Sequence, residues 1–140
     1  MRYLLDTSVW FRGASEPETV PEDLRQILGL RDAQFGLSAI SLWEVGKKNQ
    51  TGRLPLKKEL GAWLKDALEA HIHLLPLTAE IVTDAMRLPD FPTRDPADEL
   101  IVATARVHNL TLLTTDTKLK NYRHARIRWF KTVAAKTVND

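Results

Sequence analysis

Short apolar runs alternate along the chain with longer segments of helical period, and this alternation constrains the fold more than any other feature. Five of the runs are too short for helices and predict buried strands, at residues 3–5, 35–39, 72–75, 111–115 and 127–130. Periodicity and capping residues predict helices at residues 21–31, from Ser41 onward, at 59–70, at 78–88 and from Asp95 onward. Strands that alternate with helices are typical of a parallel sheet with helices on both faces, so we expect an α/β fold.

Composition places the chain among ordinary globular domains. Its 140 residues are 44% hydrophobic and 27% charged, which predicts one domain over residues 1–140 and excludes wholesale disorder. The absence of cysteine excludes disulfides, cysteine-ligated zinc, iron–sulfur clusters and thiol catalysis. No charge-free run approaches the ~20 apolar residues that span a bilayer, and the first residues lack the apolar core of a signal peptide. We therefore expect a cytoplasmic protein with no membrane contact.

Four acids follow the expected strands or begin the expected helices. They are Asp6 and Asp116, directly after apolar runs, and Glu44 and Asp98, in first helical turns. Each can be explained alone: a terminal Asp as a turn or cap residue, Ser41 with Glu44 as a capping box, and Asp95 as a helix cap. Capping does not explain why all four would gather at one edge of the sheet. Ligands bind at the carboxyl ends of parallel strands, so this edge is the candidate site.

If the four acids converge, they form an all-oxygen pocket with a formal charge of up to −4. Hard divalent cations such as Mg²⁺ and Mn²⁺ prefer these ligands, whereas zinc usually takes histidine or cysteine. The four histidines show no spacing typical of a zinc site. A carboxylate-held Mg²⁺ orients a water nucleophile and offsets charge on a phosphodiester. The pattern therefore favours metal-dependent phosphodiester hydrolysis.

The basic residues are distributed unevenly. Seven of them lie beyond residue 116 together with one acid, whereas the first 116 residues carry a net charge of −4. A second basic stretch follows Glu44. Such clusters attract the phosphates of a nucleic acid, and a solvated Lys/Arg surface explains them equally well. The candidate RNA-binding residues are Lys47, Lys48, Arg53, Lys118 and Lys120.

In chain order, four motifs resemble those of the PIN-domain ribonucleases, and within them the VapC-type toxins of toxin–antitoxin pairs. The motifs are residues 4–9 (LLDTSV), 41–45 (SLWEV), 95–105 (DPADELIVATA) and 112–116 (LLTTD). The resemblance covers nearly the whole chain. It implies a three-layer α/β/α PIN-like domain with a parallel sheet of strand order 3-2-1-4-5. In that order the first and fourth strands are neighbours, which brings Asp6 and Asp116 together.

The resemblance also assigns roles to individual residues. It implies that the catalytic, metal-binding acids are Asp6, Glu44, Asp98 and Asp116. Mg²⁺ is then the cofactor, and Mn²⁺ can substitute. Ser8 and Thr114 match hydroxyl positions that support the site by hydrogen bonding. Family members are endoribonucleases that often cleave tRNA or ribosomal RNA, commonly form homodimers, and are inhibited by a VapB-type antitoxin that places a basic side chain in the acidic pocket.

Two positions leave alternatives open. Glu99 stands where the subgroup often has arginine, and Asp95 lies within one turn of Asp98, so an exchange of their roles stays open. The presence of all four acids favours catalysis over a non-catalytic RNA- or partner-binding PIN-like module. A PIN nuclease outside the toxin class is the nearer alternative. Ser8 stands where a haloacid-dehalogenase-type phosphatase requires a second aspartate, which excludes that class.

The tryptophans are expected to have structural roles. Trp10, Trp43 and Trp63 should pack in the core or at a dimer interface rather than stack on bases. The apolar helix faces around Trp43 and Trp63 are candidates for the groove that receives the antitoxin. Packing is also expected for Tyr122 and Trp129 in the basic C-terminal segment.

Overall fold

Five parallel strands form the central sheet of the structure, a computed structural model that describes residues 1–133. The strands are β1 (Tyr3–Leu5), β2 (Phe35–Ser38), β3 (Ile72–Leu75), β4 (Thr111–Thr114) and β5 (Ile127–Trp129). Their order across the sheet is β3-β2-β1-β4-β5, which confirms the expected order. Two charges of the basic C-terminal segment, Lys136 and Asp140, lie outside the described residues. One domain over residues 1–140 therefore stays a prediction.

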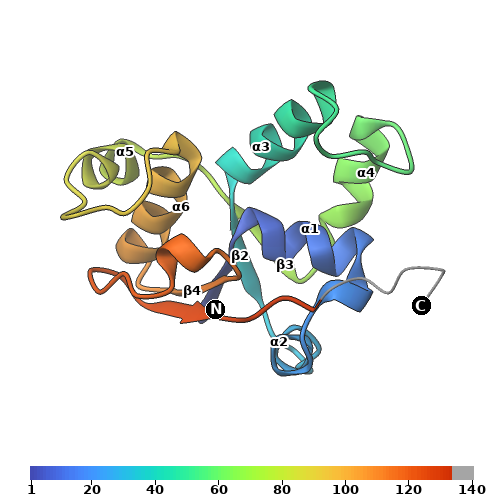
Figure 1. Ribbon diagram of the computed structural model, residues 1–140, viewed down its shortest axis with the longest axis horizontal. Coiled ribbons are helices and arrows are strands. Elements are labelled where there is room, and N and C mark those ends of the chain that lie inside the picture. Colours follow the sequence, from blue (N-terminus) through green and yellow to red (C-terminus); the bar gives the residue numbers. More distant parts are fainter. Residues whose placement is uncertain (134–140) are drawn as a thin grey trace.

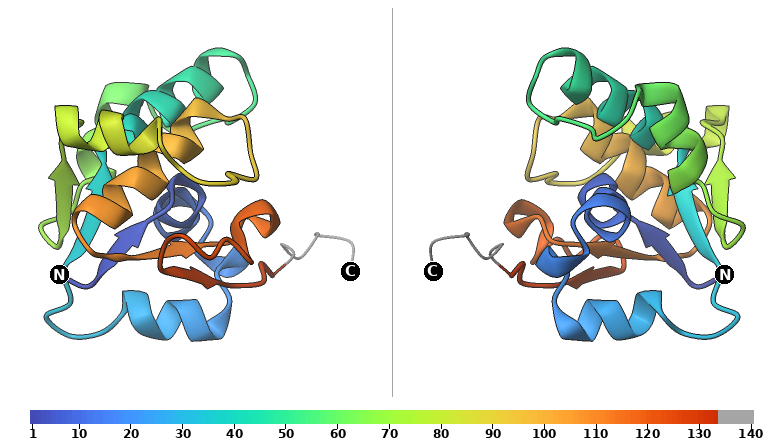
Figure 2. Two further views of the ribbon diagram at one scale, coloured as in Figure 1. Left: turned by 90° about the vertical axis from the view of Figure 1, so that its left-hand side faces the viewer. Right: turned by 90° about the vertical axis from the view of Figure 1, so that its right-hand side faces the viewer.

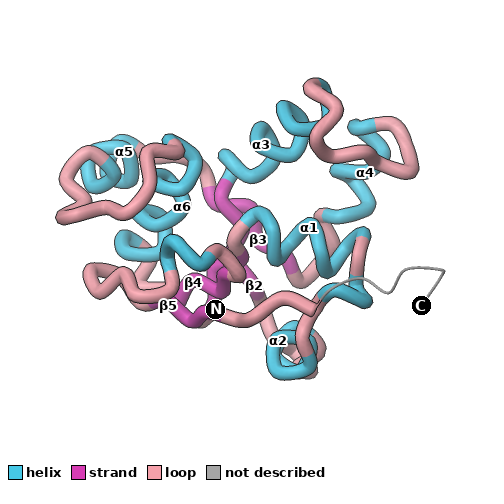
Figure 3. The backbone as a smooth tube through the Cα atoms, viewed as in Figure 1, coloured by secondary structure: helices cyan, strands magenta, loops and turns pink. Residues whose placement is uncertain are grey.

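Helices cover both faces of the sheet. They are α1 (Thr7–Ser15), α2 (Glu22–Leu28), α3 (Ala39–Gln50), α4 (Leu60–Ala67), α5 (Ala79–Ala85) and α6 (Pro96–Val107), with short 3₁₀ turns η1 (Pro17–Thr19) and η2 (Thr117–Leu119). Figure 1 shows α5 and α6 on one side and α1, α3 and α4 on the other, and Figure 3 shows the strands between these groups. In both views of Figure 2, α2 lies at the opposite end of the molecule from α3. The three-layer α/β/α architecture is confirmed.

Alternation along the central strands divides the core into two halves. Leu4 and Leu112 pack in one cluster with buried residues of α6, such as Ile101. Their neighbours Leu5 and Leu113 pack in the other cluster, with residues of α1, α2 and α4. Successive strand residues point to opposite faces of the sheet, and both faces of these short apolar strands are buried.

No helix within residues 1–133 is long and apolar enough to cross a membrane.

The strand order reverses between β1 and β4. From β1 the chain builds outward through β2 and β3, and it then returns to add β4 and β5 on the other side of β1. Leu5 lies opposite Leu113, and the backbone N–H of Asp6 donates to the Leu113 carbonyl at 3.0 Å. Ligands bind outside the carboxyl ends of strands at such a switch point, and Asp6 lies there.

The capping box expected at Ser41 is wrong, because α3 begins earlier than the pattern predicts. Strand β2 passes directly into α3, and Ser38 is the helix N-cap, with extended backbone angles (φ −68°, ψ 140°). Its hydroxyl accepts a hydrogen bond from the Ile40 N–H at 3.3 Å. Ser41 instead lies inside the first turn, where its Oγ is 2.8 Å from the Thr7 Oγ1. Glu44 consequently lies in the second turn and does not cap the helix.

Other boundaries differ from the sequence prediction by a few residues. The expected helices end early, at Leu28, Ala67 and Ala85, and three expected strands end one residue early. Gly29 follows α2 as its C-cap, a position where helices commonly stop. Helix α1 is not predicted from the sequence, because only the polar residues 6–8 separate its short apolar run, Val9 to Phe11, from that of β1.

Core packing is confirmed for Trp10 and Trp63, whereas Trp43 lies outside the core, and its expected place at a dimer interface stays a prediction. The ring of Trp63 is 5% exposed, lies 5.1 Å from the ring of Trp10, and donates through Nε1 to the Ser15 hydroxyl at 2.8 Å. The side chain of Trp63 is therefore not available to line a groove for a partner protein. Trp43 on α3 is 59% exposed. Tyr122 is buried as expected, and its hydroxyl donates to the Pro89 carbonyl at 2.7 Å.

The cap assignment predicts a stability difference between the two ends of α3. Ser38→Ala should lower the free energy of unfolding by ~1 kcal/mol, because the first turn loses its side-chain acceptor. Thr51→Ala is the matched control at the exposed C-terminal end of the same helix and should change stability by no more than ~0.5 kcal/mol. Urea unfolding followed by circular dichroism measures both, and equal losses would contradict the assignment.

Candidate active site

Asp6 is held at the carboxyl end of β1 by hydrogen bonds to both of its oxygens. As the N-cap of α1, it accepts the Thr7 N–H at Oδ1 (2.9 Å), and it accepts the Thr114 hydroxyl at Oδ2 (2.5 Å). The residue is only 6% exposed. A carboxylate fixed in this way has one orientation, which suits a group that must present its charge to a ligand.

Burial raises the pKa of Asp6 from 3.8 to about 6. This net value also includes smaller raising effects from the negative charges of Glu44 and Asp116, and the opposing effects of the hydrogen bonds from Thr114 and the Thr7 backbone. Such charge effects weaken with distance, so they indicate that Glu44 of α3 and Asp116 at the end of β4 lie near Asp6. The structure thus brings together the acids that the strand pattern singled out.

Glu44 supplies a buried carboxylate with one free oxygen. Its Oε2 lies 3.2 Å from the Nζ of Lys48, one turn further along α3. Its Oε1 is buried without any hydrogen-bond partner among the described residues, and the residue is 8% exposed. An unpaired buried carboxylate oxygen costs free energy and calls for a ligand to satisfy it.

Asp98 lies in the first turn of α6, and its Oδ2 accepts the Thr93 hydroxyl at 2.9 Å. Burial raises its pKa from 3.8 to about 7, and the charges of Asp6, Asp95 and Asp116 add to the shift. Asp95 has a different environment, because it is exposed and caps α6 by accepting the Ala97 N–H at 2.9 Å. The geometry therefore separates the two acids, with Asp98 turned to the acidic cluster and Asp95 occupied as a cap.

Asp116 completes the cluster from the segment that follows β4. Its backbone N–H donates to the Thr114 Oγ1 at 3.1 Å, and its Oδ1 accepts the Lys118 N–H at 2.9 Å. The Thr114 hydroxyl thus accepts from Asp116 and donates to Asp6. One side chain links the two acids that end the central strands.

Threonine hydroxyls hold two of the four acids, and only one of these hydroxyls was predicted from the sequence. Of the two expected, Thr114 contacts Asp6, whereas the Ser8 hydroxyl is 3.2 Å from Thr115 Oγ1 and bonds to none of the four acids. Sequence reasoning missed Thr93, which donates to Asp98 and also accepts the Asp95 N–H at 3.1 Å. The sequence feature that could have indicated this role is a threonine two residues before the N-cap of α6, a spacing typical of Ser/Thr turns.

The candidate RNA-binding residues divide into two groups. Lys47, Lys48 and Arg53 line one hollow of about 460 Å³ between α3 and the start of α6, and Glu44 lies in its wall. Lys118 lies at a separate hollow with Arg123. Lys120 lines neither hollow, and its Nζ sits 4.2 Å from the centre of the Trp129 ring.

The chemistry of the acids fits a divalent cation. Within residues 1–133, no three His, Cys, Asp or Glu side chains lie close enough to enclose a metal ion. Mg²⁺ does not need such a cage, because it retains several waters and takes one or two carboxylates. The free Oε1 of Glu44 and the mutual repulsion that raises the Asp6 pKa are both relieved by a cation at this place. Its one or two carboxylate ligands would come from among Asp6, Glu44, Asp98 and Asp116.

Comparison with known proteins identifies a family and a shared fold. The PIN domain family profile matches residues 3–125. Ribonuclease VapC22 of Mycobacterium tuberculosis is 32% identical over 123 residues, which cover 88% of this chain and 93% of that protein. Two solved structures share the fold. VapBC2 from Rickettsia felis, bound to a promoter DNA fragment, has a TM-score of 0.70 at 19% identity and covers 91% of this chain and 98% of its own. A toxin–antitoxin complex from Klebsiella pneumoniae has a TM-score of 0.61 at 21% identity, with coverages of 85% and 90%.

The raised pKa of Asp98 predicts how stability depends on pH without metal. The folded state holds the proton more tightly than the unfolded chain, so this stabilisation is complete below pH ~4 and is lost as the pH rises through 7. Asp98→Asn removes the ionisation and should be more stable than wild type at pH 8, by ~1–2 kcal/mol after a discount for partial exposure. Urea titrations at pH 4.5 and 8 measure the difference, which should shrink at low pH. Asp95→Asn makes the same charge change and should gain less, and an equal gain would contradict the assignment.

Proposed function

The chain belongs to the PIN domain family, and on that premise we propose that it is a divalent-metal-dependent endoribonuclease and the toxin of a toxin–antitoxin pair. One observation carries the proposal: acids from four separate segments lie at the carboxyl end of the sheet, where Glu44 keeps a buried oxygen free and neighbouring acids contribute to the raised pKa values of Asp6 and Asp98. The ribonuclease name of the 32% identical relative supports the reaction class. The fold shared with a toxin–antitoxin complex supports the biological role.

In this proposal the four acids are the metal-binding and catalytic residues, Asp6, Glu44, Asp98 and Asp116. Mg²⁺, with Mn²⁺ as a substitute, would supply positive charge against the scissile phosphate and orient the attacking water. Thr114 holds Asp6 and Thr93 holds Asp98, so that two of the carboxylates keep their direction. The role of Ser8 as a further supporting hydroxyl is part of the proposal, acting through Thr115.

The proposed substrate is RNA, with tRNA and ribosomal RNA as the candidate classes. Phosphodiester hydrolysis consumes one water and leaves one phosphate group and one hydroxyl. Lys47, Lys48 and Arg53 lie beside Glu44, and Lys118 follows Asp116 closely, so cations flank the acids on two sides. Together with Lys120, these residues would neutralise the phosphates that adjoin the cleaved bond.

The proposed partner is a VapB-type antitoxin. An arginine of such a protein can pair bidentately with the carboxylates that would otherwise hold the metal. We place the protein in the cytoplasm, where its RNA substrate occurs, and expect a homodimer of a domain that spans residues 1–140. Neither the dimer nor the compartment alters the chemistry proposed for the acids.

Removal of one acid should stop RNA cleavage while the fold survives. Asp6→Asn, Glu44→Gln, Asp98→Asn and Asp116→Asn should each lower the cleavage rate by on the order of 10²-fold or more, because each takes charge from the metal site. The wild type should cleave with Mg²⁺ or Mn²⁺ and lose activity in EDTA. Gel assays on total tRNA and ribosomal RNA measure this, with circular dichroism as the check on folding.

Asp95→Asn is the matched control for that series. Asparagine caps a helix as well as aspartate, so this variant should stay within ~3-fold of wild type. A larger loss at Asp95 than at Asp98 would reverse their assigned roles. Cleavage that continues undiminished in EDTA would refute the metal mechanism, and a folded wild type without any cleavage would favour the non-catalytic PIN module.

Expression of the wild-type chain by itself should arrest bacterial growth, because an uninhibited endoribonuclease destroys cellular RNA. Co-expression of the candidate antitoxin encoded next to it should restore growth, since an inserted basic side chain blocks the acids. Glu44→Gln should be harmless without any partner. Colony counts after induction, with immunoblots for soluble protein, test the role. Harmless wild-type protein at equal levels would favour a PIN nuclease outside the toxin class.

A further inference from the structure

Trp43 stands out as a large apolar side chain left in solvent beside the acidic cluster. It directly precedes Glu44 on α3 and is 59% exposed, whereas Trp10 and Trp63 are buried. None of the aromatic pairs among residues 1–133 includes Trp43. The core therefore does not account for its position.

Trp43 forms one wall of the 460 Å³ hollow between α3 and the start of α6. This volume lies within the ~300–1,000 Å³ range of clefts that hold small ligands. Apolar side chains line it from Ile40 on α3 and from Pro96, Ala97 and Leu100 on α6, and the helix cap Asp95 also lies in its lining. Glu44 belongs both to this lining and to the acidic cluster, so the hollow opens beside the proposed site of cleavage.

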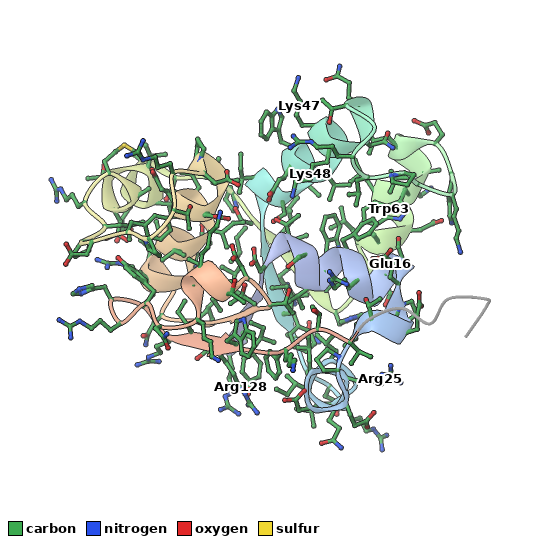
Figure 4. All side chains as sticks on the ribbon, in the orientation of Figure 1. Glu16, Arg25, Lys47, Lys48, Trp63 and Arg128 are labelled. Atoms are coloured by element: carbon green, nitrogen blue, oxygen red, sulfur yellow. The ribbon has the colours of Figure 1, made fainter. Side chains whose placement is uncertain are left out.

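Three cations stand around this apolar hollow. Lys47 and Lys48 come from α3, where Figure 4 shows them as neighbours. Arg53 is brought back by the end of the helix: Gly52 adopts φ 79°, and the Arg53 N–H donates to the Lys48 carbonyl at 2.9 Å. This left-handed glycine turn is the Schellman motif, and it places Arg53 at the hollow beside the two lysines.

An aromatic wall, apolar sides and surrounding cations together match a nucleotide, which has a flat base and charged phosphates. We propose that this hollow is a subsite for one unpaired nucleobase of the RNA, stacked on Trp43 with its adjoining phosphates against Lys47 and Arg53. The inference rests on the proposed ribonuclease activity and specifies its substrate: the strand must be single or splayed open next to the cleaved bond. A base within an A-form duplex cannot reach such a wall.

Charge argues against a second copy of the chain as the occupant. In a dimer with its two-fold axis at this hollow, Lys47 and Arg53 would lie near the same cations of the other copy. RNA phosphates complement these cations instead. The subsite also explains why Lys47 and Lys48 lie on the same helix as Glu44: one segment of RNA would contact both these cations and the proposed site of cleavage.

The test compares two probes in EDTA, where no cleavage interferes. One is a fluorescein-labelled RNA of nine alternating cytidines and adenosines, and the other is an abasic oligomer of the same length and charge. By fluorescence anisotropy, Trp43→Ala should weaken binding of the RNA about tenfold and of the abasic oligomer less than twofold, because only the RNA loses a stacked base. Trp43→Phe should retain most of the affinity. Lys47→Ala should weaken both probes equally and lower the salt dependence.

Met86→Ala is the matched control, because Met86 is 67% exposed and lies outside the hollow. It should leave both affinities unchanged. The exposed position of Trp43 predicts that its variants fold, and thermal melts by circular dichroism check this. Equal losses for both probes, or no loss for either, would overturn the subsite.

Two further outcomes identify another occupant and overturn the proposal. If Trp43→Ala keeps full RNA affinity but sediments as a monomer where the wild type is a dimer, the hollow is an interface between copies. If the variant keeps full RNA affinity but the antitoxin no longer rescues growth, the hollow is the groove that binds the antitoxin. If the wild-type protein cleaves RNA with Mn²⁺, the proposed function holds, and these outcomes overturn only the subsite. Wild-type protein that neither binds nor cleaves RNA would refute both proposals.

Discussion

Repulsion among carboxylates is the constraint on which the rest of this structure depends. Asp6 and Glu44 are both almost fully buried, and the negative charges of Glu44 and Asp116 make ionisation of Asp6 less favourable. A protein interior tolerates such crowding only when hydrogen bonds or a cation offset it. Thr114 and Thr93 provide the hydrogen bonds, and Lys48 is the cation that pairs with this cluster among the described residues. In the proposed function, a divalent ion would remove the remaining imbalance.

The sheet topology explains why the acids meet. Asp6 follows β1 and Asp116 follows β4, and these strands are adjacent only because the chain returns past β1 after building β2 and β3. The Thr114 hydroxyl then bonds across the switch point to both acids. Helices α3 and α6 add Glu44 and Asp98 from above the same edge. Each of the four acids lies in or directly next to a strand or helix, so the packed elements themselves position the carboxylates.

Helix α3 joins two tasks through its periodicity. Glu44 and Lys48, one turn apart, form an ion pair at the acids, while Trp43 and Lys47, also one turn apart, lie on the adjoining stripe that lines the hollow. Successive side chains on a helix point about 100° apart, so the side chains of Trp43 and Glu44 reach adjoining parts of the surface. Direct entry from β2 into α3 makes this geometry rigid, because no loop separates the sheet from the acid. The expected capping box at Ser41 failed for the same reason.

Local pattern was enough to predict the strands, the parallel α/β class and the acids at the strand ends, because burial on both faces and helix capping leave short-range signals in the chain. The resemblance of four motifs then supplied the strand order and the choice of acids. Other features depended on residues far apart in sequence: Thr7 bonds with Ser41, and Thr114 with Asp6, across separations of 34 and 108 residues. The exposure of Trp43, the free oxygen of Glu44 and the difference between Asp95 and Asp98 were likewise decided by tertiary structure. The physical reason is that burial and charge coupling belong to a place in the fold, and a residue acquires them only when distant elements pack around it.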